Sequence, residues 1–362
     1  MKILIIGPSW VGDSVMAQTL YKRLKQEESE CSIDVISPKW CLALVKRMPE
    51  VHKGIVSPFQ HGDLKLVSRY FFAKQLRETN YDRSIVLTNS LKSSLIPLFA
   101  QIPVRTGWLG EMRYFFLNDI RMLEKKENDL MVEKFAALSI KEEAYKLENL
   151  SFPSLQIDFK NQKERIDGLE INSDLPSLAI CPGAEFGPSK KWPPKFYSQV
   201  AREYINKGWN VLCFGSVNDI DTGIEIQNLN NLLNENNFHN LIGKTSLEDV
   251  IDLLAFCEKV VTNDSGLMHI AAAVERPLVA LYGPSSPEYT PPLISRKVII
   301  RKTEGYEKIR RGDVNEGYHQ SLLSIEPSEV IRATTEEKEY QIGMLQSLHS
   351  YKSDLAKESL YK

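Results

Sequence analysis

Short apolar runs rich in β-branched residues alternate with amphipathic segments along most of the chain. The runs are typical of buried strands, which we predict at residues 2–6, 33–36, 83–87, 178–181, 211–214, 259–262 and 278–282. Helices are predicted between them, among others at residues 16–25, 196–207 and 247–256. Alternating strands and helices form right-handed βαβ units and parallel sheets covered on both faces. We therefore expect an α/β fold of the doubly wound kind.

The alternation lapses between residues 141 and 174, a charged stretch, and resumes at residue 175. A chain of 362 residues is long enough for two domains, each with its own core. We predict an N-terminal domain at 1–170, a C-terminal domain at 171–334 and a charged helical tail at 335–362. Ile342, Leu345 and Leu348 form an apolar stripe on this tail that would suit packing back on the first domain.

Composition narrows the functional classes. The chain is 43% hydrophobic and 25% charged, as is usual for a soluble globular protein. Its formal net charge of -2 argues against a nucleic-acid partner, which usually demands a basic excess. The five cysteines lack a C-x-x-C pair and are expected to be reduced core residues. No apolar run reaches the ~20 residues needed to span a bilayer, and no signal peptide is evident, so we predict a cytoplasmic protein.

The first predicted strand runs into a glycine loop, Gly7-Pro8-Ser9-Trp10-Val11-Gly12-Asp13-Ser14. Its spacing is that of a nucleoside-triphosphate loop, but Asp13 replaces the lysine that must reach the phosphates. Asp13 would repel phosphates, which argues against a nucleotide hydrolase or kinase. Ligands of open α/β sheets bind beyond the carboxyl ends of strands. Asp13 therefore suits a general base or a hydroxyl-binding group there, with a helix cap as the alternative.

A second candidate site follows the predicted strand 259–262. Asp264, Ser265 and Gly266 precede a helix-prone segment, and the free N–H groups at its start favour phosphate. His269 lies three residues after Gly266 and so on the same helical face. The alternative is that Asp264 or Ser265 caps the helix while His269 packs beside it.

The loop at 182–193 carries two cations and an aromatic ring: Phe186, Lys190 and Lys191. A lysine here could neutralise charge on a departing phosphate, although a solvated pair before a proline-started helix is the alternative. Asp219-Ile220-Asp221 resembles a Mg²⁺-binding D-x-D motif. A helix cap, or a carboxylate beside a ribose hydroxyl, explains Asp219 better. No metal site is predicted.

Basic and aromatic residues are also mixed in the first half, in segments expected to be loops after strands. Such a mixture suits an anionic, sugar-like partner, although each residue alone also fits an ordinary surface position. The residues are Lys92, Arg105, Trp108, Glu111, Arg113 and Tyr114. A late polar loop, 310–313 and 317–320, has the same character and includes His319.

Several of these blocks together resemble one known family. They are the residues 7–13, 182–188, 190–193 and 262–269, with Tyr282-Gly283-Pro284-Ser285-Ser286-Pro287 and Gly317-Tyr318-His319-Gln320-Ser321. They are similar to the lipopolysaccharide inner-core heptosyltransferases of glycosyltransferase family 9, in particular the type II members. The likeness extends from Met1 to about Ile331.

The resemblance implies a GT-B fold, in which two Rossmann-like doubly wound domains face a central cleft. The N-terminal domain would bind the acceptor and the C-terminal domain ADP-heptose. Asp13 aligns with the proposed catalytic base and Lys190 with a lysine that contacts the donor diphosphate. The implied donor-binding residues are Glu185, Phe186, Lys190, Asp219, Asp264, Ser265, Gly266 and His269. The implied acceptor-binding residues are Trp10, Lys92, Arg105, Arg113 and His319. Glu185 and Phe186 stand where heptosyltransferase I carries two threonines, a departure from the family pattern.

The implied reaction is an inverting transfer of heptose from ADP-L-glycero-β-D-manno-heptose to the first heptose of the lipopolysaccharide inner core. The alternative is a related GT-B glycosyltransferase with another nucleotide-sugar donor or core acceptor, for example of the heptosyltransferase I or III type. No cofactor is required on this resemblance, and Mg²⁺ is at most stimulatory. A lipid A–Kdo–heptose acceptor implies transient contact with the cytoplasmic face of the inner membrane, although no amphipathic anchor stands out in the sequence. A non-catalytic lipopolysaccharide-binding protein would lack the donor site.

Overall fold

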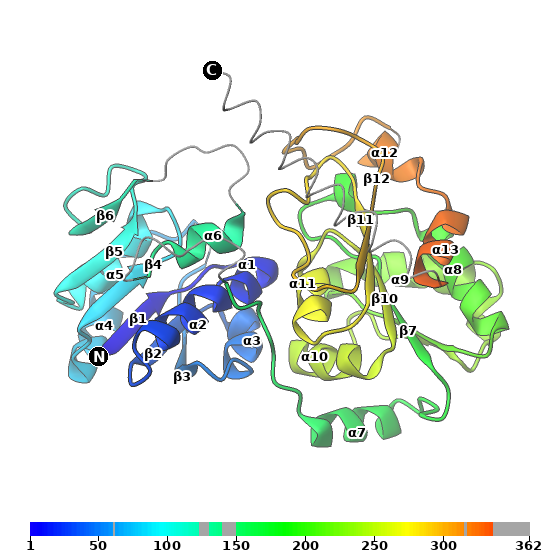
Figure 1. The fold of residues 1–362 in the computed structure, drawn as a ribbon, viewed down its shortest axis with the longest axis horizontal. Coiled ribbons are helices and arrows are strands. Elements are labelled where there is room, and N and C mark those ends of the chain that lie inside the picture. Colours follow the sequence, from blue (N-terminus) through cyan, green and yellow to red (C-terminus); the bar gives the residue numbers. More distant parts are fainter. Residues whose placement is uncertain (61, 123–129, 140–149, 315–316, 336–362) are drawn as a thin grey trace, which may run out of the picture. The chain divides into compact units, whose positions relative to one another are not determined.

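A computed structural model describes residues 1–60, 62–122, 130–139, 150–314 and 317–335. Within these residues the strands form two six-stranded, fully parallel sheets, each in its own compact α/β unit (Figure 1). The predicted α/β class, with two Rossmann-like doubly wound units, is confirmed.

The first unit comprises Met1–Phe159 together with Leu247–Ile251 and Pro287–Leu293. Its sheet has the strand order β3-β2-β1-β4-β5-β6. The strands are β1 (Lys2–Ile6), β2 (Ser32–Ser37), β3 (Val51–Val56), β4 (Arg83–Val86), β5 (Val104–Trp108) and β6 (Asp119–Arg121). The helices are α1 (Val11–Met16), α2 (Gln18–Glu27), α3 (Leu42–Lys46), α4 (Leu66–Leu76), α5 (Leu91–Phe99) and α6 (Met131–Ala136).

The second unit comprises Lys160–Ser246, Asp252–Ser286 and the described residues from Ile294 onward. Its sheet has the order β12-β11-β10-β7-β8-β9. The strands are β7 (Ser177–Cys181), β8 (Asn210–Cys213), β9 (Phe238–Asn240), β10 (Lys259–Asn263), β11 (Leu278–Tyr282) and β12 (Lys297–Arg301). The helices from this part of the chain are α7 (Phe159–Gly168), α8 (Pro194–Asn206), α9 (Ile220–Asn228), α10 (Leu247–Phe256), α11 (Gly266–Ala273), α12 (Gln320–Leu323) and α13 (Pro327–Thr335).

Each sheet has its topological switch point between its first and fourth strands. In the first sheet β1 lies beside β4, with Ile6 opposite Val86. In the second sheet β7 lies beside β10, with Cys181 opposite Thr262. Ligands of doubly wound sheets bind beyond the carboxyl ends of the strands at this point. The loops that follow β1, β4, β7 and β10 are therefore the places where function is expected.

Each unit has its own hydrophobic core. The first is built around Leu4, Ile6 and Val86 and is closed by Ile96 of α5. The second joins the strands β7, β8, β10 and β11 to α8, and it completely buries Tyr197 of this helix and Trp192 just before it. Burial on both faces explains why the central strands are continuous apolar runs in the sequence.

The predicted strands are all present, but the structure adds five: β3, β5, β6, β9 and β12. The helix predicted at 16–25 is wrong in its bounds, because α1 and α2 are separated at Ala17. The helix α7 lies within the segment where the alternation lapses, so that segment is not without structure. The boundary predicted near residue 170 stays a prediction. Of the tail predicted at 335–362, residues 336–362 lie outside the described residues.

All five cysteines are buried and free, as predicted. Among the helices of the described residues, none has the length and apolar character needed to cross a bilayer.

Candidate active site

The glycine loop after β1 presents Asp13 at the carboxyl edge of the first sheet. The Gly7 amide donates to Ile36 O at 2.9 Å, and a Cβ on Gly7 would lie only 2.8 Å from that oxygen. Glycine is therefore required for this close approach. Trp10 is the N-cap of α1, and Asp13 lies half-buried in its first turn, where the helix dipole favours a carboxylate. The position predicted for Asp13 is confirmed, and its role as a base stays a prediction.

An exposed indole that the sequence reasoning missed lies beside this loop. Trp40 follows β2, and its Nε1 donates to Ser9 O at 2.9 Å. Its side chain is 54% exposed and that of Trp10 is 53% exposed. Two exposed indoles on neighbouring strand-end loops are unusual for large apolar side chains and suit stacking on a sugar ring. The signal was a tryptophan directly after a strand, in Pro38-Lys39-Trp40.

The other acceptor-binding candidates of the first unit are only partly brought together. Lys92 lies in the first turn of α5, which follows β4 at the switch point. Arg105 instead lies inside β5, and its guanidinium donates to Phe116 O and Ile102 O, each at 2.8 Å. The expectation that Lys92, Arg105 and Trp108 lie in loops is wrong. The short strand Val104–Trp108 was not predicted, because Pro103 and Arg105 interrupt the apolar run that would mark it.

Arg113 is completely buried and holds the backbone of its own loop. Its guanidinium donates to Thr88 O at 2.8 Å and also to Trp108 O and Gly110 O. Glu111 accepts from the Leu91 amide at 2.6 Å and so ties the same loop to the start of α5. The surface position assumed for Arg113 is therefore wrong. The guanidinium can be buried because its several N–H donors bind these carbonyl oxygens at the same time. Its predicted contact with acceptor stays untested.

Two lysines of the loop after β7 form ion pairs with carboxylates from two different elements. Lys190 Nζ lies 2.5 Å from Asp264 Oδ2, at the end of β10, and Lys191 Nζ lies 2.7 Å from Asp219 Oδ1. The Lys190 ammonium also lies 5.3 Å from the Phe186 ring centroid. Asp264 and Asp219 are 6% and 4% exposed, so both carboxylates need these cations. The structure thus brings together three predicted donor-binding residues, Lys190, Asp264 and Phe186, and separately pairs a fourth, Asp219, with Lys191.

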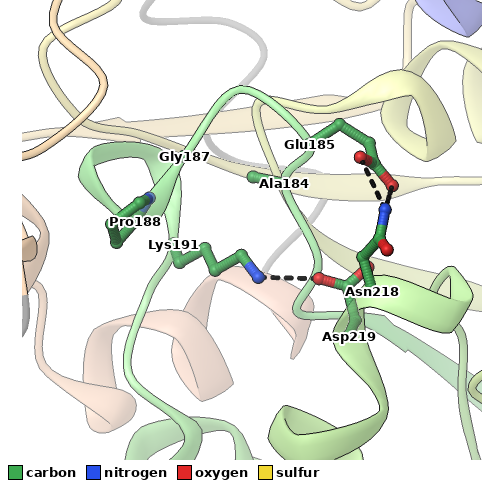
Figure 2. A pocket seen from close by; sticks show the side chains of 7 residues that line it. All are labelled: Ala184, Glu185, Gly187, Pro188, Lys191, Asn218 and Asp219. Atoms are coloured by element: carbon green, nitrogen blue, oxygen red, sulfur yellow. Dashed lines mark hydrogen bonds and ion pairs between the residues drawn. The ribbon is translucent and has the colours of Figure 1, made fainter.

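A cavity of about 430 Å³ opens beside the second of these pairs (Figure 2). It is lined by Ala184, Glu185, Gly187, Pro188, Lys191, Asn218 and Asp219. Figure 2 shows the Lys191 ammonium directed at Asp219 and the Glu185 carboxylate directed at Asn218, whose Nδ2 lies 3.2 Å from Glu185 Oε2. A Cβ on Gly183 would lie 2.4 Å from Asp219 Oδ2, so this glycine leaves the space that the carboxylate occupies. Asn218 was not among the predicted site residues.

Asp219 also completes a capping box whose N-cap is Ser216. Its Oδ2 accepts from the Ser216 amide at 3.1 Å and from the Ser216 hydroxyl at 2.9 Å. Asp221 lies in the first turn of α9. Across the part of the chain that the structure describes, no three His, Cys, Asp or Glu side chains are grouped to hold a metal ion.

The helix α11 begins where the phosphate site was predicted. Ser265 is its N-cap and Gly266 its first residue, so the free amides at this end are available to an anion. His269 is 6% exposed, and burial lowers its pKa to about 4 against a smaller opposing effect of Asp264. The imidazole is therefore neutral at neutral pH, and it can serve as a hydrogen-bonding group rather than a cation.

A buried asparagine that the sequence reasoning overlooked connects these loops. Asn263, the last residue of β10, accepts hydrogen bonds from Trp192 N at 3.1 Å and Tyr197 Oη at 3.0 Å. Its Nδ2 donates to Pro182 O at 2.7 Å. The loop that carries Lys190 is thereby fixed to the strand that precedes Asp264.

His319 lies in the second unit, whereas the other acceptor-binding candidates lie in the first. It is the N-cap of α12, and its Nδ1 accepts from the Ser321 amide and contacts the Ser321 hydroxyl at 2.6 Å. A capping role explains these contacts, and its acceptor-binding role stays a prediction.

Comparisons with known proteins agree with this geometry. The family model "Glycosyltransferase family 9 (heptosyltransferase)" matches residues 69–319. Lipopolysaccharide heptosyltransferase 2 of Salmonella typhimurium is 48% identical over 91% of this chain and 97% of its own. Lipooligosaccharide heptosyltransferase 2 of Haemophilus influenzae is also 48% identical, over 93% of this chain and 99% of its own.

A solved structure gives the same result for the fold. The ADP-heptose LPS heptosyltransferase II of Escherichia coli superposes with a TM-score of 0.84 at 43% identity, covering 93% of this chain and 98% of its own. The predicted GT-B class of fold is confirmed by this likeness. The chain belongs to glycosyltransferase family 9, the heptosyltransferases.

Proposed function

We propose that this heptosyltransferase moves a heptose from ADP-L-glycero-β-D-manno-heptose onto the first heptose of the lipopolysaccharide inner core, with inversion at the anomeric carbon. The observation that carries the donor assignment is the joining of Lys190, Asp264 and the start of α11 at the switch point of the second sheet. The acceptor assignment is supported by relatives that are 48% identical and are heptosyltransferases of type 2.

The donor side follows from charge placement. A diphosphate carries negative charge that grows on the leaving oxygen as the bond to the sugar breaks. The free amides at Ser265 and Gly266 and the ammonium of Lys190 would stabilise that charge. Lys190 is paired with Asp264. When the diphosphate binds, the Lys190 ammonium would contact both the Asp264 carboxylate and the diphosphate, and the carboxylate would orient the ammonium. The cavity beside Lys191 and Asp219 is proposed for the nucleoside, with Asp219 accepting from a ribose hydroxyl.

The acceptor side is assigned to the loops after β1, β2 and β4. The acceptor hydroxyl attacks the anomeric carbon from the face opposite ADP and forms the new C–O bond. The old C–O bond breaks, and ADP leaves with the electron pair. Asp13 takes the hydroxyl proton. Trp10 and Trp40 would stack on a sugar of the acceptor, and Lys92 would pair with an anionic group.

The remaining assignments follow from the acceptor. We propose no required cofactor, because charge on ADP is met by Lys190 and main-chain amides. The acceptor is proposed to be a lipid A–Kdo–heptose core, which would bring a cytoplasmic enzyme to the inner face of the inner membrane.

The test is transfer from purified ADP-heptose to a truncated core that ends in a single heptose, with the linkage and anomeric configuration of the product read by NMR. One new heptose on the first heptose, with the anomeric configuration inverted, is the expected product. Parallel reactions use a heptose-free core, a core with two heptoses and other nucleotide sugars. Preference for one of these substrates would assign the chain to the related alternative, of the heptosyltransferase I or III type.

A further inference from the structure

One face of α4 exposes an unusual number of large apolar side chains. Val67 is 69% exposed, Phe71 59%, Leu66 49% and Tyr70 41%, and Leu64, just before the helix, is 51% exposed. These five residues are called the outer α4 face. The opposite side of the helix buries Ala73 and Leu76 in the core of the first unit. Large apolar side chains grouped on one surface usually mark a contact site.

The outer α4 face is held in a fixed place. Arg69 is buried, and its guanidinium donates to Leu64 O at 2.7 Å and Asp63 O at 2.9 Å. At the other end, Arg77 Nε donates to Phe99 O at 3.0 Å. The Tyr70 ring meets Phe99 of α5 edge-on, with centroids 5.8 Å apart. The apolar side chains are therefore exposed on a helix whose two ends are held by hydrogen bonds to neighbouring backbone.

The charged side chains carried by the α4 segment itself are of one sign, although acidic residues, Asp63 and Glu78, flank it. From Leu64 to Arg77 every charged side chain is basic: Lys65, Arg69, Lys74 and Arg77. Lys65 and Lys74 are exposed at the two ends of the face, and Lys65 also pairs with Asp63 at 2.7 Å. An apolar centre bordered by lysines is complementary to an anionic phospholipid surface, where the ammonium groups meet phosphates and the apolar groups enter the acyl boundary.

We propose that the outer α4 face docks the protein on a bilayer containing anionic phospholipids. The inference rests on the proposed function, because a lipid-linked acceptor must be reached at a membrane surface. Val67 and Phe71 would enter the boundary between headgroups and acyl chains, with Lys65 and Lys74 at headgroup level. The sequence does not reveal this face, because α4 is apolar on its core side as well and shows no amphipathic pattern.

The first arm of the test is flotation of the full chain with vesicles of phosphatidylethanolamine and phosphatidylglycerol, compared with phosphatidylcholine alone. The double variant Val67→Asp/Phe71→Asp should lose about tenfold or more in affinity for the anionic vesicles. Two control variants each place one aspartate at an exposed apolar site elsewhere: Phe115→Asp (87% exposed) and Leu233→Asp (60% exposed). Both should bind within about twofold of the wild type.

The second arm compares transfer to the acceptor embedded in anionic vesicles with transfer to the same core after removal of its acyl chains. The double variant should be slowed about tenfold or more on the vesicle acceptor and stay within about twofold on the soluble one. This split separates docking from catalysis. If the wild type transfers heptose to neither acceptor, the proposed function fails, and vesicle binding alone then decides the role of α4.

Three results would overturn the docking proposal. The first is that the wild type fails to bind anionic vesicles. The second is that the double variant binds them as tightly as the wild type. The third is that Phe115→Asp abolishes binding while the α4 change does not. A double variant that only turns a dimer into a monomer in sedimentation, with vesicle binding unchanged, would assign the face to a second copy of the chain and likewise overturn it.

Discussion

The buried asparagine at the end of β10 offers the sharpest test of how the donor loops are held. The Asn263→Ala change removes three hydrogen bonds. Trp192 N and Pro182 O lose this partner in a dry interior, whereas Tyr197 Oη keeps its hydrogen bond to Cys181 O at 3.3 Å. Each buried polar group left unpaired costs about 1–3 kcal/mol. A water molecule that enters the vacated space would recover part of this. With two groups left unpaired, we therefore expect a loss of about 2–4 kcal/mol in the free energy of unfolding.

The assay is hydrogen exchange of β7 and β10 peptides across a urea series, which reports the opening free energy of the second unit. The same loops carry Lys190 and Asp264, so the affinity for ADP should fall as well. The control is Asn236→Ala, an exposed asparagine of the same unit that should change stability by less than about 0.5 kcal/mol. A loss below about 1 kcal/mol at Asn263, with ADP affinity unchanged, would refute the reasoning.

Three further predictions concern single side chains. The pKa of His269 in the folded protein, about 4, lies below its unfolded value of 6.5. The unfolded chain therefore takes up this proton first, and up to ~3 kcal/mol of stability, present above pH ~6.5, is lost as pH falls to ~4. In urea unfolding from pH 7.5 to 4.5, His269→Gln should flatten this dependence relative to the wild type; an unchanged slope would contradict the burial argument. Trp40→Ala should raise the acceptor KM about tenfold and leave the ADP-heptose KM unchanged. Trp40→Phe should restore most of the acceptor affinity, since an aromatic ring can still stack on the sugar. An unchanged acceptor KM in Trp40→Ala would remove Trp40 from the site. Lys191→Met leaves the Asp219 carboxylate without its cation and should weaken ADP binding about tenfold by calorimetry, with partial recovery in Lys191→Met/Asp219→Asn; no recovery would mean that Lys191 acts on ADP directly.

The central strands were predictable because they are buried on both faces. Runs such as 178–181 and 278–282 contain little besides apolar residues, and every residue of the corresponding strands is buried. The edge strand β3 (Val51–Val56) is different: His52 and Lys53 are exposed, so no apolar run marks it. Strands β6 and β9 are only three residues long, which is too short for any period to show.

The parts of the site that depend on residues close together in the sequence were predictable. The glycine at position 7, the acid at position 13 and the helix start at Ser265-Gly266 follow from turn and capping rules. The pairing of Lys190 with Asp264 and of Lys191 with Asp219 joins residues far apart in the sequence, so spacing could not assign it. Arg113 was misplaced for a related reason, since its burial depends on carbonyls supplied by three other positions.

The central claim is most directly tested by heptose transfer with Asp13→Asn, an isosteric change that removes the proton acceptor. Initial rates are measured with ADP-heptose and a core ending in a single heptose, and ADP affinity is measured on the same protein. We predict that ADP binds as to the wild type, because the donor residues lie in the second unit, while kcat falls by about 10²–10⁴. Transfer at the wild-type rate by Asp13→Asn would contradict the account.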